Sequence, residues 1–431
     1  MDDTSDALPL AIDAARARAG TRPAPTAPRA FALRTFSSLR HRNFRLLWTG
    51  NLATQAGYWM NSVAVGWLVF DMTHSAAWLG ISGFVSGIPL LLFSLVGGVL
   101  ADRVNRWKLL MVNQMLGMGI ALAYALLLTF GLIELWHILL LSFLFGVMQA
   151  INVPTRQAMM PTLVGRDGLV NAVALHSVGM NTMRIVGPSI AGVLIATVGV
   201  KGCYWVQAVG YIWAFVNVLQ MRVPPQAPID RARSPLRNLT DGVRYLFSDK
   251  TLLGLMTLVA MPTIFAFPYQ QLLPLFANDI LNVGPTGLGL LTSAIGAGAL
   301  VTALGLASAG DLKAKGRLAA ATTTIYGAAI AAFALSPWFP LSLLALAAAG
   351  ILWAIASALI QTLLQMQSKP EYVGRIMSVF ALTWGLQPIG NLIIGGAAEI
   401  TGAPLALAMG GIISVLGSAL LLVKLPRLRQ L

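Results

Sequence analysis

One cation, Arg184, lies in the middle of an apolar stretch that runs from residue 169 to 197. A guanidinium at the centre of a membrane helix costs about 2.5 to 3.5 kcal/mol, so this side chain is expected to face protein or water rather than lipid. A spacing of three or four residues places Ser177, Asn181, Pro188 and Gly192 on the same helical face. Arg184 is interpreted as a contact for a substrate or a coupling ion; a structural arginine bonded to backbone carbonyls is the alternative.

Amide, hydroxyl and aromatic side chains form polar stripes in other apolar segments, where every buried polar group needs a partner. Such stripes predict a largely neutral, aromatic-lined substrate cavity with one cation, although for any single amide a helix-to-helix hydrogen bond is equally open. The residues expected to line this cavity are Asn51, Gln55, Trp59, Gln149, Asn181, Arg184, Phe265, Gln270, Trp353, Ser357, Gln361 and Gln387.

The segments that must position these residues are long and apolar. Hydrophobic residues make up 57% of the 431 residues and charged residues 10%, whereas soluble domains carry about 25% charged residues. The sequence therefore predicts an all-α membrane protein. Windows of about 19 residues give twelve spans, at residues 44–70, 78–101, 109–130, 136–154, 169–197, 202–221, 251–278, 287–309, 317–335, 339–365, 376–399 and 403–423.

The net charge of +14 is explained by the predicted topology. With the N-terminus inside, every Lys and Arg except Lys201 and Arg184 falls on the cytoplasmic side, as the positive-inside rule requires. No surplus of basic residues then calls for a nucleic acid. The expected location is the bacterial inner membrane, with both termini in the cytoplasm.

The sequence lacks the residue patterns that several kinds of chemistry require. The single cysteine, Cys203, excludes an internal disulfide, and the four scattered histidines have no metal-ligand spacing. No Gly-rich phosphate loop with a lysine and no pair of intramembrane carboxylates is present, so we expect neither an enzyme nor a cofactor. No Asp or Glu lies clearly inside a predicted span, which leaves the coupling residue open.

The polar connection at residues 222–250 divides the chain into two halves that repeat. Asp102 and Asp311 are separated by the same number of residues as Arg166 and Arg375, each pair ending corresponding inner loops. The expected organisation is a disordered cytoplasmic leader (1–40), an N-terminal six-helix bundle (41–221), a cytoplasmic linker (222–250) with a short helix near 239–247, a C-terminal six-helix bundle (251–424) and a cytoplasmic tail (425–431).

Two motifs resemble signatures of the major facilitator superfamily. The first is the loop signature G-x-L-A-D-R-x-G-R-[KR]; Asn105 replaces its second glycine, and Asn also tolerates left-handed backbone. Its matching residues are Gly98, Leu100, Ala101, Asp102, Arg103 and Arg106. The second is the antiporter signature G-P-x-x-G-G in the fifth span, matched by Gly187, Pro188 and Gly192, with Ala191 replacing one glycine. The ridge Ala294, Gly298 and Thr302 of the eighth span could pack against it, with simple packing elsewhere as the alternative.

The resemblance implies a major facilitator fold of twelve helices in two six-helix pseudo-repeats, whose first, fourth, seventh and tenth helices line the cavity. It also implies a cytoplasmic gate at the loop signature, in which Asp102 faces the amino end of the eleventh helix. The residues assigned to gating are Gly98, Asp102, Arg103, Arg106, Asp311 and Arg375.

Several further stretches resemble the branch containing the enterobactin exporter, the transmembrane secretion effectors and the macrolide efflux pumps. They include Asn43–Arg45, Thr73–Ser75 and Pro154–Met159. This resemblance implies a monomeric secondary exporter that moves a small amphipathic molecule, such as a siderophore or a drug, out of the cytoplasm by proton antiport. Its partners are then the small-molecule substrate, protons and membrane lipids. An uptake or lipid-flipping carrier of the same fold is the alternative.

Overall fold

The computed structural model describes residues 37–222, 235–308 and 314–425. Every regular element in these ranges is helical, which confirms the predicted all-α fold. The first half of the chain, called the N-half, contains α3 (Arg42–Thr73), α4 (Ala76–Arg103), α5 (Arg106–Thr129), α6 (Leu135–Thr197) and α7 (Val200–Gln220). Helix α6 has two limbs, corresponding to the fourth and fifth predicted spans, which meet at Gly165 with a backbone φ of 69°.

The second half, called the C-half, repeats this arrangement after the linker helix α8 (Pro235–Ser248). Its seventh span is interrupted by a turn after Phe265, and its eleventh by the 3₁₀ helix Trp384–Leu386, so each is divided into two α-helices. Its helices are α9 (Lys250–Phe265), α10 (Tyr269–Leu275), α11 (Gly284–Ser308), α12 (Lys315–Leu335), α13 (Phe339–Gln367), α14 (Val373–Thr383), α15 (Gln387–Thr401) and α16 (Ala403–Lys424).

Eleven of these rods are long and apolar enough to cross a membrane. The remaining one, α3, is 32 residues long but carries amides and hydroxyls that lower its hydropathy, among them Asn51, Thr54 and Asn61, all of them buried. Because these polar groups face neighbouring helices, α3 completes a set of twelve rods.

Side-chain caps fix several helix starts. Ser75 accepts a hydrogen bond from Trp78 N at 3.3 Å before α4, and Asp249 caps α9 by accepting from Thr251 N at 2.7 Å. Asn105 caps α5 and accepts from Trp107 N at 3.0 Å. Its φ of −58° shows that the turn does not use the left-handed conformation that asparagine tolerates. Asn105 also accepts from Lys108 N at 3.2 Å, so one side chain satisfies two backbone N–H groups of the first turn.

Two predicted boundaries are also wrong. The fourth span does not end at residue 154, because its helix continues through Pro154 and Pro161 to Gly165. Residues 37–40, expected in the disordered leader, form a 3₁₀ turn held against α6. Ser38 N donates to Asn171 Oδ1 at 3.0 Å, and Ser38 Oγ donates to Gly168 O at 3.1 Å. The rest of the predicted leader lies outside the described residues.

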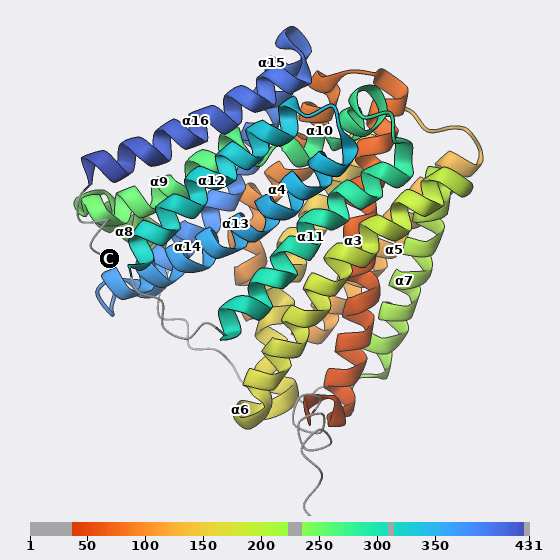
Figure 1. The fold of residues 1–431 in the computed structure, drawn as a ribbon. Helices are drawn as coiled ribbons and strands as arrows, with labels where there is room; N and C mark the ends of the chain where they lie inside the picture. Colours follow the sequence, from red (N-terminus) through yellow and green to blue (C-terminus); the bar gives the residue numbers. More distant parts are fainter. Residues whose placement is uncertain (1–36, 223–234, 309–313, 426–431) are drawn as a thin grey trace, which may run out of the picture.

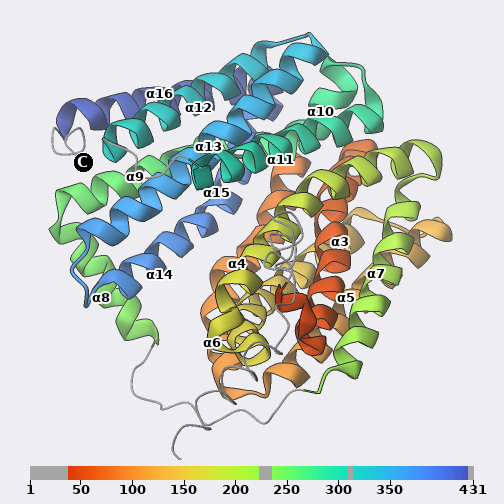
Figure 2. The ribbon, with the colours of Figure 1, turned by 60° about the horizontal axis from the view of Figure 1, so that its bottom comes forward.

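The two halves lie side by side, with helices before α8 on one side and helices after it on the other (Figures 1 and 2). We call the end at which α3 begins and α16 ends the basic end, and the other the opposite end. Contacts between halves lie toward the opposite end, where Gly80 approaches Gly395 and Gly192 approaches Gly289. A single hydrophobic core spans both halves, whereas a smaller core at the basic end belongs to the N-half alone.

Candidate functional site

Arg184, on the second limb of α6, lies over the ring of Trp59 on α3. The guanidinium carbon is 5.2 Å from the ring centroid, within the range of a cation–π interaction. Gly187 permits this approach, because a Cβ there would stand 2.8 Å from Trp59 Cβ. Arg184 therefore faces another helix, as its sequence position predicts.

Three phenol groups lie within electrostatic range of this cation. Tyr58 of α3, Tyr269 of α10 and Tyr326 of α12 are close enough to Arg184 to interact with it electrostatically. Within the described ranges, neither a carboxylate nor a backbone carbonyl pairs with Arg184. The Tyr326 hydroxyl is buried and has no hydrogen-bonding partner there either. The cluster thus offers a cation and a phenol donor for which the described part of the chain supplies no acceptor.

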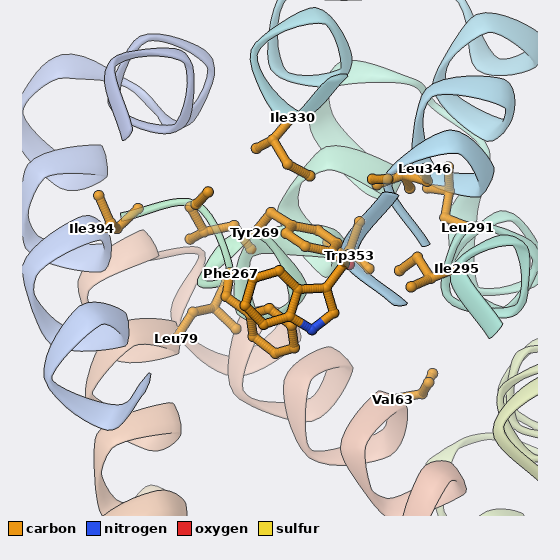
Figure 3. Close-up of a cluster of buried hydrophobic side chains, with 14 of the residues drawn as sticks. Val63, Leu79, Phe267, Tyr269, Leu291, Ile295, Ile330, Leu346, Trp353 and Ile394 are labelled. Atoms are coloured by element: carbon orange, nitrogen blue, oxygen red, sulfur yellow. The ribbon is translucent and has the colours of Figure 1, made fainter. Parts of the chain in front are cut away.

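Aromatic rings of the C-half pack around Tyr326. The Trp353 ring centroid lies 5.2 Å from that of Tyr326, 5.6 Å from that of Phe267 and 5.9 Å from that of Trp384. Phe267 lies in the turn between α9 and α10, and Trp384 follows α14, so both broken rods contribute rings. Figure 3 shows Phe267, Tyr269 and Trp353 beside Leu79 and Val63 of the N-half.

Only some of the predicted polar stripes have hydrogen-bonding partners among the described residues. Gln270 Nε2 donates to the Tyr269 hydroxyl at 3.3 Å, which links this residue to the Arg184 cluster. Asn181 Nδ2 donates to the backbone of its own helix, at Ser177 O, at 2.9 Å. Gln361 is exposed. Among the described residues, no side-chain hydrogen bond forms at the half-buried Gln55, Ser357 or Gln387, and the Phe265 ring is also half-buried.

The small residues of the fifth span contact two different neighbours. Gly187 lies against α3, whereas a Cβ on Gly192 would stand 2.8 Å from Pro285 O of α11. Pro188 O approaches Gly289 of α11. Ser189 Oγ and Ser293 Oγ, 2.8 Å apart, add a hydrogen bond between the two helices.

The expected partner ridge on the eighth span is wrong. Gly298 and Thr302 face α13 instead of α6, because a Cβ on Gly298 would stand 2.1 Å from Ala347 O, and Thr302 Oγ1 donates to Ile351 O at 3.1 Å. The face of α11 that meets α6 contains Gly289, Ser293 and Gly296.

A second buried cation, Arg156, lies beyond the predicted end of the fourth span, where the sequence predicts a loop. It is only 7% exposed, and its guanidinium donates to Asn152 Oδ1 on α6 and to Thr54 Oγ1 on α3, the latter at 3.0 Å. Asn152 in turn donates to Gln149 Oε1 at 3.3 Å. The spacing of Gln149, Asn152 and Arg156 by three and four residues, read through Pro154, is the signal that could have found this cluster.

His176 extends this polar cluster to the second limb of α6. Its Nδ1 lies 3.2 Å from Nδ2 of the buried Asn51, and it interacts electrostatically with Arg156. The N-half therefore contains a polar cluster, made of Gln149, Asn152, Arg156, Thr54, Asn51 and His176, which joins α3 to both limbs of α6.

The residues assigned to gating lie at the basic end. Arg106, the first residue of α5, donates to Ala101 O of α4 at 3.0 Å and to Ala158 O of α6 at 2.8 Å, and so links these three helices. Arg103 is exposed, and a Cβ on Gly98 would meet no atom within 4 Å. The Asp102 side chain and all of Asp311 lie outside the described residues.

Arg375, the remaining residue assigned to gating, contacts the linker helix. Its Nη1 lies 3.5 Å from Asp241 Oδ2 of α8, and its guanidinium carbon lies 4.8 Å from the Tyr372 ring centroid. Tyr245 of α8 stacks on Tyr372 with centroids 4.2 Å apart. The linker helix α8 therefore packs against the start of α14.

Comparisons with known proteins agree with this architecture. The family model described as transmembrane secretion effector matches residues 33–431. The enterobactin exporter EntS of Shigella boydii serotype 18 is 32% identical over 400 residues, which cover 90% of this chain and 94% of the relative. EntS of Citrobacter koseri is 30% identical over 397 residues, which cover 90% and 93%.

Solved transporters share the fold at low sequence identity. An inward-facing, unoccupied bacterial homologue of the human lysosomal transporter Spinster superimposes with a TM-score of 0.70 at 14% identity, covering 90% of this chain and 98% of that one. The nucleoside transporter NupG gives 0.69 at 12% identity, with 88% and 98% covered. These similarities confirm the predicted major facilitator fold. The chain belongs to the transmembrane secretion effector family of this superfamily, which makes it a multi-pass membrane transporter of the exporter type.

Proposed function

We propose that this protein exports a small amphipathic molecule, anionic or polar and neutral, from the cytoplasm across a bacterial inner membrane. Export is driven by proton antiport and proceeds by alternating access. The transporting unit is a monomer. The relatives named as enterobactin exporters support a siderophore-like cargo. The cluster of Arg184, Trp59, Tyr326 and Trp353 is the substrate site in this proposal.

The observation that carries the proposal is the uncompensated Arg184. A cation inside the membrane is expensive and normally marks a substrate or ion pathway. Arg184 lies over Trp59, beside aromatic rings of the other half, with no carboxylate of the described chain opposite it. An acidic or oxygen-rich substrate would supply the missing acceptor, while the rings would bind its apolar part.

The proposed orientation follows from charge. Arg103, Lys108, Arg222 and Lys424 are all exposed at the basic end. Under the positive-inside rule this end faces the cytoplasm. Both chain ends then lie on the cytoplasmic side.

The proposed cycle rocks the N-half against the C-half about the Arg184 cluster. In the structure, the halves pack through Gly80 and Gly395, and through Gly192 and Gly289, on the opposite side of this cluster from the basic end. The smaller core of the N-half at the basic end receives no residue of the C-half. This asymmetry supports a state whose substrate site opens toward the cytoplasm.

Transport by everted membrane vesicles tests the proposal. Energised vesicles should accumulate enterobactin or the anionic dye carboxyfluorescein, and nigericin, which collapses the pH gradient, should abolish accumulation. We expect Arg184→Gln to lower the initial rate at least about tenfold and Arg184→Lys to lower it less, since lysine keeps the charge but not the planar group. Lys201→Gln, which removes an exposed cation at the opposite end, is the matched control.

Two outcomes would reject this function. If Arg184→Gln transports carboxyfluorescein and the cation ethidium as fast as the unmodified protein, Arg184 is not a substrate contact. If right-side-out vesicles, rather than everted ones, accumulate the probe, the protein is an uptake carrier.

A further inference from the structure

We propose that Glu399 is a gating residue that holds the opposite end of the transporter closed. Its carboxylate binds the start of a helix in the other half of the molecule. The proposal rests on the alternating-access cycle proposed above, but it concerns a residue far from the substrate cluster.

The contact joins α15 of the C-half to α4 of the N-half. Glu399 Oε2 accepts hydrogen bonds from Ser75 Oγ at 2.9 Å and from Ala77 N at 3.0 Å. Ser75 is also the N-cap of α4 and accepts from Trp78 N. The carboxylate therefore satisfies a free backbone N–H of the first turn of α4 and places a negative charge at the positive end of its dipole.

Glycines bring the two helices close enough for this contact. A Cβ on Gly80 would stand 2.6 Å from Asn391 O and 2.9 Å from the Gly395 Cα, so neither helix can carry a larger side chain there without moving apart. Glu399 follows Gly395 by one helical turn, which brings its side chain to the first turn of α4.

The contact must break when the opposite end opens. Alternating access requires α4 and α15 to separate at this end, and Glu399 cannot stay bonded to α4 when they do. Among the described residues of the opposite end, Glu399 is the only charged side chain bonded across the two halves. Glu134 provides a contrast, since its carboxylate accepts from Trp136 Nε1 at 2.6 Å within the N-half.

The proposal predicts a change in the balance between closed and open forms of the opposite end. A charge at an exposed helix N-terminus shifts an equilibrium by about two- to five-fold. Removing the Glu399 carboxylate should therefore raise the ratio of open to closed molecules by about that factor. Ser75→Ala should shift the ratio in the same direction but by less, because the Ala77 N–H remains bonded.

Distances between spin labels on the full-length protein in lipid nanodiscs test this directly. Leu132→Cys and Trp338→Cys place one label on each half at the opposite end, and both positions are exposed. Val170→Cys and Glu371→Cys provide a second pair at the basic end. The native Cys203 is buried and should not react with the label.

We expect Glu399→Ala to increase the population with long distances at the opposite end and to shorten distances at the basic end. Glu134→Ala should leave both distributions unchanged. The proposal is overturned if Glu399→Ala matches the unmodified protein, or if Glu134→Ala shifts the populations equally. The distance measurements need no substrate, so their outcome can be interpreted even if the transport assay shows no transport.

Discussion

The Arg184 guanidinium carbon lies 5.2 Å from the Trp59 ring centroid, and both residues belong to the N-half. The pair does not bridge the two halves, so it can persist while they move. The aromatic rings around Trp353 belong to the C-half. A substrate bound between the two groups would therefore contact both moving parts, which is what alternating access requires of a central site.

Trp59→Leu should lower the transport rate, because Arg184 loses the aromatic ring that orients it. A desolvated cation–π contact is worth about 2 kcal/mol, and 1.4 kcal/mol corresponds to a factor of ten. We therefore expect the initial rate in everted vesicles to fall by about thirtyfold, with Trp59→Phe intermediate. Trp205→Leu, at an exposed tryptophan of α7, is the control. Equal rates for the two leucine variants would contradict a role for Trp59.

The sequence predicts the spans and the inward-facing Arg184 because hydropathy and helical spacing are local properties. It cannot tell which neighbour a face will meet, and so the small residues Ala294, Gly298 and Thr302 are assigned to α6 although α13 packs near Gly298 and Thr302. Periodicity identifies a face, whereas tertiary packing decides its partner.

Proline explains the missed Arg156. Pro154 and Pro161 favour the prediction of a loop after the fourth span, since proline removes a helix hydrogen bond. In a membrane, neighbouring helices can stabilise such a helix, and here α6 continues to Gly165. Arg156 then falls inside the bundle. The partners of Glu399 are equally invisible to local patterns, because Ser75 and Ala77 lie in the other half of the chain.

Arg156→Met should destabilise the protein rather than alter its substrate preference. Hydrogen bonds to a charged group contribute about 1.5 to 3 kcal/mol each, and the change leaves Thr54 Oγ1 and Asn152 Oδ1 without this donor. We expect a lower melting temperature in detergent. Lys201→Met, at an exposed cation, should melt like the unmodified protein. A normal melting temperature with lost transport would instead assign Arg156 to the substrate pathway.

Gly165→Ala and Gly374→Ala should differ in their effect on thermal stability, although the two glycines occupy corresponding positions in the repeat. Gly165 has φ 69° and ψ −179°, a conformation available essentially only to glycine. Alanine there should cost about 1 to 3 kcal/mol. Gly374 lies within α14, and a Cβ there would meet no atom within 4 Å. The melting temperature should therefore fall for Gly165→Ala only, and equal melting of the two variants would contradict the strain.

Arg375→Gln and Asp241→Asn should have small, non-additive effects on stability. The two charges are 3.5 Å apart and partly exposed, and such surface pairs contribute about 0 to 1 kcal/mol. Since each variant removes the same contact, the double variant should melt close to either single variant. Melting curves of the four proteins, in a double-mutant cycle, measure this coupling. If the effects simply add, the contact between Arg375 and Asp241 contributes nothing to stability. A transport defect in Arg375→Gln that Asp241→Asn lacks would support the gating role assigned from the sequence independently of stability, because only Arg375 could then engage another partner during the cycle.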